Sequence, residues 1–260
     1  MPVWAGLRRL NRTGAGLAKG ITAKLQDQDA APRVPKPAGN RGRRPKLAVA
    51  SNTPEAILDA AESLFARNGL HGVTMRQVAS AASVDPALLH YYFNTKRGLF
   101  DAAFLRRAQV LNEERIASLE AYERASGGQM TVEGCVVAFF APMMQLWANG
   151  GEGWKNYFRL VAVVNNTPDW GGETMNRYFN PAIQRLIATL GKVLPDARPE
   201  DLYWAWSFMS GALTLAFADT GRVDRLSGGL CRSSDIAAIR LRLAPFLAAG
   251  VEQMCRSRKT

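Results

Sequence analysis

Side chains that can donate or accept hydrogen bonds gather around position 90 of this 260-residue chain. His90 and Tyr91 are adjacent, Lys96 follows shortly after them, and Arg76 precedes them. No metal-spaced cluster, Gly-rich phosphate loop or nucleophile with a partner base accompanies them, and the chain has only two histidines. Cationic and neutral hydrogen-bonding groups without such a constellation favour recognition of an anion and disfavour catalysis.

Three short helices are predicted to position these side chains within residues 53–100. The first has apolar residues at helical spacing between a start signal, Thr53-Pro54, and a stop signal, Asn68-Gly69. The second is predicted to begin after Thr74, whose hydroxyl suits an N-cap. Its alanine residues allow another helix to approach closely.

The third helix is predicted to begin after Asp85, an N-cap residue, with Pro86 at the first helical position. Leu89, Tyr92 and Phe93 are assigned to its core side. A short helix, a tight turn and a capped second helix have the shape that fits the major groove of DNA. Residues 51–98 are therefore predicted to be a DNA-binding domain.

Contacts with DNA divide into contacts to phosphates and contacts to bases. Thr74 and Lys96 suit phosphates, and Arg76 can reach either a phosphate or a base. His90 and Tyr91 can donate to or accept from base edges. A packing role is the alternative for His90. The candidate DNA-binding residues of this domain are Thr74, Met75, Arg76, Pro86, Ala87, Leu88, His90, Tyr91 and Lys96.

Three motifs within these helices carry a family resemblance: Thr-x-x-x-Val-Ala, Ala-x-Val-x-Pro-x-x-Leu and Tyr-Phe-x-x-Lys-x-x-Leu-Phe. Together they resemble the TetR family of bacterial transcriptional regulators over about 50 of the 260 residues. The resemblance implies an N-terminal DNA-binding domain, a helical domain for ligand binding and dimerisation, and repression relieved by a small molecule. It also implies a phosphate contact for His90, where the family usually has Tyr.

The chain departs from the family at Ser83, because the family usually has Gly in this turn. If the position needs a positive φ, Ser costs on the order of 1 kcal/mol there. We therefore expect a slightly rearranged turn.

The net charge of +11 is concentrated at the N-terminus. Residues 1–46 hold 11 Lys and Arg against 2 Asp and Glu, which leaves 22 against 20 for the remainder. A basic arm over residues 1–50, expected to be disordered, predicts a polyanionic partner, and a solvated tail is the alternative. Its opening is acid-poor and resembles a transit peptide, but the bacterial motif argues against an organelle.

An Arg-Gly-Arg segment in this arm resembles an AT-hook, with Arg41, Arg43 and Arg44 as candidate DNA-binding residues. Such a thin cationic segment fits a narrow A·T-rich minor groove, and a generic basic tail is the alternative. The three cysteines include no CxxC pair, so neither a zinc site nor a disulfide framework is indicated. No apolar stretch is long enough to span a membrane.

The remainder, residues 99–258, is predicted to be a helical ligand-binding and dimerisation domain, which makes the whole fold all-α. A nearly all-apolar helix over 131–147 contains Pro142, which is predicted to kink or break it and to leave a gap. Adaptable Met and aromatic side chains around a gap suit an apolar ligand, although plain core is the alternative. The candidate ligand-binding residues are Phe139, Met143, Met144, Trp147, Phe158, Phe179 and Phe208.

Further helices are predicted over 154–166, 173–194 with a kink at Pro181, 199–220 and 234–254. The last two have Ala/Gly-rich faces, which match the family's dimer of paired C-terminal helices. The segment from 178 onward also resembles the C-terminal domain of a subgroup that includes fatty-acid-responsive regulators. Arg159, Asn165 and Asn166 are the polar candidates for orienting a ligand, with surface solvation as the alternative.

These observations predict a ligand-responsive repressor that binds a palindromic operator as a homodimer and is released by a small apolar effector. The alternative is an architectural or ligand-independent DNA-binding dimer, and an enzyme is disfavoured. No cofactor, metal or membrane partner is expected. The expected location is the bacterial cytoplasm, in association with the nucleoid.

Overall fold

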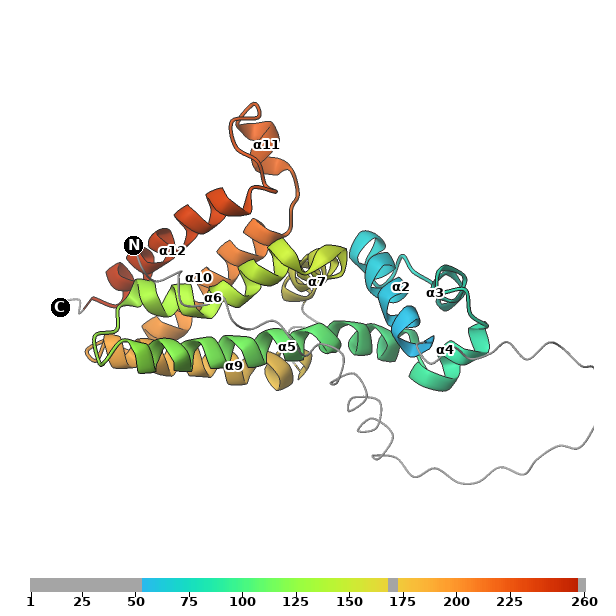
Figure 1. The fold of residues 1–260 in the computed structure, drawn as a ribbon, viewed down its shortest axis with the longest axis horizontal. Helices are drawn as coiled ribbons and strands as arrows, with labels where there is room; N and C mark the ends of the chain where they lie inside the picture. The colour runs from blue at the N-terminus through green and yellow to red at the C-terminus, as the bar shows by residue number, and fades with distance from the viewer. Residues whose placement is uncertain (1–52, 168–172, 257–260) are drawn as a thin grey trace, which may run out of the picture. The chain divides into compact units, whose positions relative to one another are not determined.

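The computed structural model describes residues 53–167 and 173–256, which contain helices and no strand (Figure 1). The predicted all-α fold is therefore confirmed. In chain order the helices are α2 (Thr53–Asn68), α3 (Met75–Ala81), α4 (Pro86–Phe93), α5 (Lys96–Ala125), α6 (Val132–Asn149), α7 (Gly151–Asn165), α9 (Glu173–Val193), α10 (Pro199–Phe217), α11 (Arg222–Leu226) and α12 (Ile236–Met254).

Helices α2 and α3 begin and end where local chemistry predicts. α2 ends before Gly69, whose φ of +66° is the left-handed geometry that favours glycine after a helix. α3 begins with a capping box, in which the Gln77 amide donates to the Thr74 hydroxyl at 3.2 Å and the Thr74 amide donates to the Gln77 side chain at 2.8 Å. Two otherwise unpaired amides at the start of α3 are thereby satisfied.

Helix α4 follows the predicted Asp85 cap, whose carboxylate accepts from the Ala87 amide at 2.8 Å, with Pro86 as its first residue. In the turn before it, Ser83 has a φ of +55°. The expected rearrangement of this turn is wrong, because the chain keeps the left-handed geometry with Ser in place of Gly. The Val84 amide donates to the Ala79 carbonyl at 3.0 Å across the turn.

Helix α5 runs from the helix-turn-helix into the rest of the fold (Figure 1). Its N-cap is Thr95, whose hydroxyl accepts from the Gly98 amide at 2.9 Å. Its N-terminal part packs on α2, with the rings of Phe65 and Phe100 5.2 Å apart. Further along, α5 packs against α6 and α9. One continuous helix thus belongs to both the DNA-binding end and the body.

Helix α6 is buried along most of its length, as its composition predicts. The predicted break at Pro142 is wrong, because a single helix runs from Val132 to Asn149. α6 packs against α5, α7, α9 and α12, and these neighbours hold both halves of the helix in place despite the missing amide donor. α9 likewise continues through Pro181.

Large apolar side chains are exposed on the two predicted C-terminal helices and the segment between them. Trp204 and Phe208 of α10 are 58% and 61% exposed, and their rings stack 5.8 Å apart. On α12, Leu241 and Phe246 are also exposed. The short helix α11 between them was not predicted. No helix within the described ranges has the length and apolar character needed to cross a bilayer.

We predict that Ser83→Gly stabilises the fold, because Gly relieves the left-handed strain that Ser bears at φ +55°. The strain of about 1 to 2 kcal/mol is partly offset by the larger unfolded-state entropy of Gly, about 0.5 to 1 kcal/mol. We expect a net gain of about 0.5 kcal/mol, measured as a shift in the midpoint of urea unfolding.

Ser80→Gly is the matched control, because Ser80 is also exposed but lies inside α3. Glycine weakens a helix interior, so this variant should lose about 0.5 kcal/mol. Equal losses for the two glycine variants would show that the turn is not strained.

Candidate DNA interface and candidate effector cavity

The outer edge of α4 presents the side chains that the sequence assigned to DNA bases. Tyr91 is 76% exposed, and His90 and Arg76 are exposed as well. The His90 ring lies against the end of its own helix, with Nδ1 3.2 Å from the Asn94 carbonyl oxygen. Leu89 is fully buried on the opposite side, which fixes the orientation of the helix. A polar edge on a capped, anchored helix suits insertion into a DNA groove.

The candidate phosphate contacts flank this edge and are already engaged within the protein. The Lys96 ammonium donates to the Val73 carbonyl oxygen at 3.0 Å and so fastens the loop before α3 to the start of α5. An ammonium has three donors, so two remain for a phosphate. The Thr74 hydroxyl is occupied by the capping box with Gln77.

The other candidates differ in exposure. Pro86 and Ala87 are exposed, whereas Met75 and Leu88 are half-buried. The predicted minor-groove residues, Arg41, Arg43 and Arg44, lie outside the described residues.

An apolar cavity of about 50 Å³ lies between α5, α6, α7, α9 and α10. Among the predicted ligand-binding residues, Met143, Phe158 and Phe179 line it. Phe139 and Trp147 do not line the cavity, but their rings pack against residues that do. Their centroids are 5.7 Å from Trp206 and 6.5 Å from Phe217, respectively, and both of these partners face the cavity.

The remaining two predicted ligand-binding residues lie away from this cavity. Met144 is buried elsewhere in the fold, and Phe208 is on the exposed face of α10. Both residues were chosen for their type, because the sequence does not show which side of its helix each one faces.

Several lining residues were missed by the sequence reasoning, and Arg115 on α5 is the most informative. It sits four residues after Leu111 and four before Leu119, both buried, so helical spacing places it on the inward stripe. A charged residue on an apolar stripe was the available signal. The other missed lining residues are Val161, Ile183, Trp206, Ser210, Leu213, Thr214 and Phe217.

The polar candidates proposed for a ligand head group are placed differently from one another. Asn165 lines the cavity and donates to the Thr214 hydroxyl at 3.0 Å. Asn166 is exposed and donates to the Ala162 carbonyl of its own helix. Arg159 lies outside the apolar cavity, 3.6 Å from a carboxylate oxygen of Asp219.

A buried carboxylate connects the DNA-binding helices to the body. Glu62 of α2 is 1% exposed and accepts from Arg107 Nε at 2.5 Å and from Arg106 Nη2 at 3.0 Å. Arg106 also donates to Asp59 at 2.8 Å. Burial alone would lower the pKa of Arg106, but the Glu62 and Asp59 carboxylates raise it above its ordinary value. The guanidinium therefore stays charged. Burial raises the pKa of the Glu62 carboxyl above its ordinary value, while the hydrogen bonds and charges of Arg107 and Arg106 oppose this shift.

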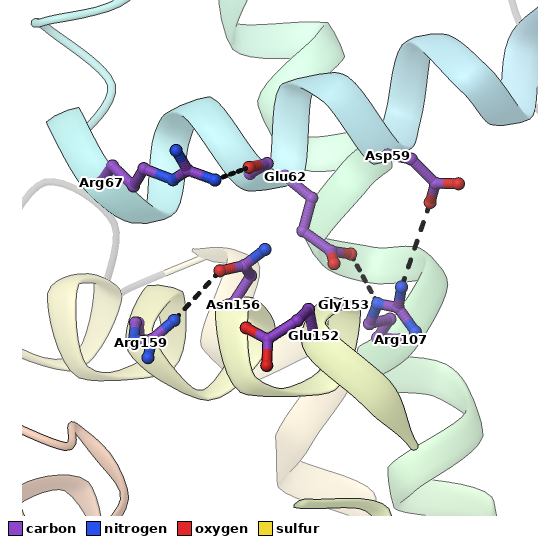
Figure 2. Close-up of a pocket in the computed structure, with 9 residues that line it drawn as sticks. Asp59, Glu62, Arg67, Arg107, Glu152, Gly153, Asn156 and Arg159 are labelled. Carbon is purple, nitrogen blue, oxygen red and sulfur yellow. Dashed lines mark hydrogen bonds and ion pairs between the residues drawn. The ribbon is translucent and has the colours of Figure 1, made fainter.

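The same contact reaches α7 through Arg107. Its guanidinium lies 5.1 Å from the centroid of the Trp154 ring. Gly153 leaves room for it, because a Cβ at this position would lie 2.0 Å from Arg107 Nη2. Figure 2 shows Glu62, Arg107 and Gly153 among the residues that line a charged recess between α2 and α7. The recess has a volume of about 360 Å³. We call the group Glu62, Arg106, Arg107 and Trp154 the joint.

Two family models match the chain, and they cover both ends of this arrangement. One, described as "Bacterial regulatory proteins, tetR family", matches residues 57–103. The other, described as "Tetracyclin repressor-like, C-terminal domain", matches residues 137–250. The first contains the helix-turn-helix and Glu62 of the joint. The second contains Trp154 of the joint and most of the cavity lining.

Curated relatives match less than a third of the chain. The transcriptional regulator BetI of Rhizobium meliloti is 32% identical over 77 residues, which are 30% of this chain and 38% of BetI. UidR of Escherichia coli K12 is 32% identical over 57 residues, which are 22% of this chain and 29% of UidR. The chain thus matches about a third of the length of these regulators, neither of which is described as an enzyme.

Solved structures show the same fold over most of the chain. A tetR family transcription regulator from Shewanella sp. PV-4 has a TM-score of 0.56 at 16% identity and covers 76% of this chain and 97% of its own. The fatty acid degradation regulator FadR from Bacillus halodurans has a TM-score of 0.51 at 16% identity and covers 81% and 98%.

We predict that Glu62→Gln destabilises the protein by about 2 to 3 kcal/mol, because it leaves two buried guanidinium groups without their shared carboxylate. The loss is read from the midpoint of chemical unfolding. Glu152→Gln is the control, since Glu152 also lines the charged recess but is exposed and pairs with Lys155 at the surface. It should leave the midpoint unchanged. Similar midpoints for both variants would mean that the joint does not hold the fold together.

Proposed function

Because this chain belongs to the TetR family of transcriptional regulators and has their DNA-binding helix-turn-helix, we propose that it is a ligand-responsive repressor. It binds an imperfect palindromic operator as a homodimer, in the bacterial cytoplasm at the nucleoid. A small effector with an apolar part enters the body and releases the DNA.

The observation that carries this proposal is the α4 edge. Asp85 caps the helix, Leu89 anchors its inner side, and His90 and Tyr91 face outward. A helix held in this way can place its outer side chains against base edges while Arg76 and Lys96 contact phosphates. In a symmetric dimer, two such helices meet half-sites about one helical turn apart.

The exposed apolar face of α10 and α12 supports the homodimer. Trp204, Phe208, Leu215, Leu241 and Phe246 are each more than half exposed in the single chain. Contiguous apolar surface of this kind marks an interaction site in a soluble protein. A second copy of the chain can cover it through a two-fold axis, since such an interface uses the same face of both partners.

The cavity supports a response to a ligand. One of its lining residues is Arg115 of α5, the helix that also carries Arg106 and Arg107 of the joint. A ligand that moves α5 therefore acts on the contact that positions the DNA-binding helices. An architectural DNA-binding dimer is the alternative, and it predicts that no small molecule changes the affinity for DNA.

We predict that Lys96→Ala and the α4 variants weaken DNA binding in different ways. An operator is first selected from random-sequence DNA, and affinities are measured by electrophoretic shift at several salt concentrations. Lys96→Ala should weaken binding to all sequences and reduce the salt slope by about 1. His90→Ala and Tyr91→Ala should each weaken operator binding by about tenfold and change the preferred bases.

Lys155→Ala is the control for charge, because Lys155 is a lysine of α7 that pairs with Glu152. It should leave both affinity and salt slope unchanged. If His90→Ala, Tyr91→Ala and Lys96→Ala all lost the same affinity for every sequence, the assignment of His90 and Tyr91 to base contacts would be wrong.

We predict that Phe208→Glu makes the protein monomeric, because it places a carboxylate in the centre of the apolar face of α10. Sedimentation equilibrium gives the oligomeric state, and operator affinity should fall at least about tenfold when only one half-site is held. Val163→Glu is the control, since Val163 is an exposed apolar residue of α7. A dimeric Phe208→Glu protein would place the interface elsewhere.

A further inference from the structure

Arg115 is a buried guanidinium with no carboxylate partner among the described residues. The residue is 6% exposed and lies on the inward face of α5. Nη1 is 3.5 Å from Asn112 Oδ1, which is at the long limit of a hydrogen bond. Nη2 is 3.5 Å from Met143 Sδ, and a thioether sulfur is only a weak acceptor. Nε has no partner.

This arrangement is unusual within the chain itself. Other partly buried arginines are paired with acids: Arg106 contacts Glu62 and Asp59, and Arg185 contacts Glu123 at 2.6 Å. Burial lowers the pKa of Arg115 to about 10, which still leaves the group charged at neutral pH. Buried charges in proteins are normally paired, because removing an unpaired charge from water is costly. Arg115 is therefore a cation without its anion.

The guanidinium faces the apolar cavity. Arg115 lines it together with Phe158, Phe179 and Trp206, and its guanidinium carbon lies 4.6 Å from the centroid of the Phe139 ring. An aromatic face stabilises a cation, but it does not satisfy the N–H donors. The site thus offers hydrogen-bond donors at one end and aromatic surface along its walls.

Two further buried hydroxyl groups without partners lie on α5 and α7, although neither residue lines the cavity. Ser118, one turn beyond Arg115 on α5, has a buried hydroxyl with no hydrogen bond. The Tyr157 hydroxyl on α7 is also buried without a partner, and it is electrostatically coupled to Arg115. Buried polar groups that lack partners require an explanation, and a missing ligand is one.

We infer that this cavity binds a small monocarboxylate, whose carboxylate pairs with Arg115 and whose apolar part lies against Phe158, Phe179 and Trp206. The assignment of this molecule as the effector rests on the proposed function, whereas the binding site itself does not. This inference narrows the chemical class of the proposed effector from an apolar molecule to an amphipathic acid.

The chemistry of the lining favours a carboxylate over other anions. A planar guanidinium matches the two oxygens of a carboxylate in a bidentate pair. A phosphate ester carries more charge and more oxygens than one cation among apolar walls can satisfy. A neutral apolar molecule would leave Arg115 without a partner, so it does not explain the residue.

The volume limits the apolar part. A cavity of about 50 Å³ is well below the roughly 150 Å³ that accommodates benzene. A short aliphatic acid fits with little rearrangement, whereas a longer chain or an aromatic acid must push the surrounding helices apart. The size of the acid therefore decides how strongly binding perturbs α5.

The test compares acids with neutral analogues of the same shape. Acetate, butyrate, hexanoate and phenylacetate are titrated into the full chain by calorimetry, each beside its amide. We expect at least one acid to bind at least about tenfold more tightly than its amide, because the amide cannot form the ion pair. Equal affinities for acid and amide, or no binding of any acid at millimolar concentration, would overturn the inference.

Arg115→Met supplies a readout that a merely structural role would not give. Removing an unpaired buried charge should raise the melting temperature of the ligand-free protein by about 2 to 4 °C while abolishing acid binding. Arg185→Met is the matched control: it breaks the ion pair with Glu123, so it should lower the melting temperature and keep acid binding. A destabilised Arg115→Met protein, or one that still binds acids, would contradict the assignment.

Operator binding separates this inference from the proposed function. If the acid binds through Arg115 but leaves operator affinity unchanged, the proposed binding site is supported and the proposed ligand-responsive repressor is contradicted. If the protein binds its operator and no acid binds, the site fails and DNA binding stands.

Discussion

The ion pair between Glu62 and the arginines of α5 is the contact on which the arrangement of the molecule depends. Glu62 lies on α2, within the DNA-binding domain, and Arg106 and Arg107 lie on the helix that continues into the body. A buried ion pair adds little net stability compared with apolar packing, but removing one partner is costly. The pair therefore acts as a constraint on geometry. The DNA-binding helices cannot turn relative to α5 without exposing or stranding these charges.

The cavity and the joint share two helices, which makes them mechanically dependent. Arg115 lies nine residues beyond Arg106 on α5, a rise of about 13 Å along a straight helix. On α7, Trp154 belongs to the joint and Phe158, one turn further, lines the cavity. A ligand that separates α5 from α7 at the cavity also pulls Arg107 away from Trp154. Close-packed interiors shift between discrete arrangements, so a small displacement at one end need not be absorbed between them.

Features that rest on neighbouring residues could be predicted from the sequence, whereas features that rest on distant pairs could not. The caps at Thr74 and Asp85 involve partners within three residues, and both were predicted. In the joint, Glu62 contacts Arg106 and Arg107, which are 44 and 45 positions away in the sequence. No local sequence pattern predicts such a contact. Pro142 misled the prediction because the local rule predicts a break, while the packing of four neighbouring helices keeps α6 continuous. The apolar composition of α6 indicated an interior, but only the fold shows which of its side chains meet a cavity.

The two sites satisfy their polar groups in opposite ways, and this difference follows from what each must do. At the DNA-binding end, the caps, the Lys96 contact with Val73 and the Glu62 ion pair leave the backbone and charges paired before any partner arrives. A surface prepared in this way loses little conformational entropy on binding. At the cavity, Arg115 keeps a buried Nε without a partner, and the Ser118 and Tyr157 hydroxyls behind the lining are also buried without partners. An unsatisfied interior destabilises the ligand-free body and makes the stability of that body depend on what fills it. Leaving buried polar groups unpaired makes the protein sensitive to a small molecule. The free energy released when the ligand pairs these groups is available to drive the change in arrangement.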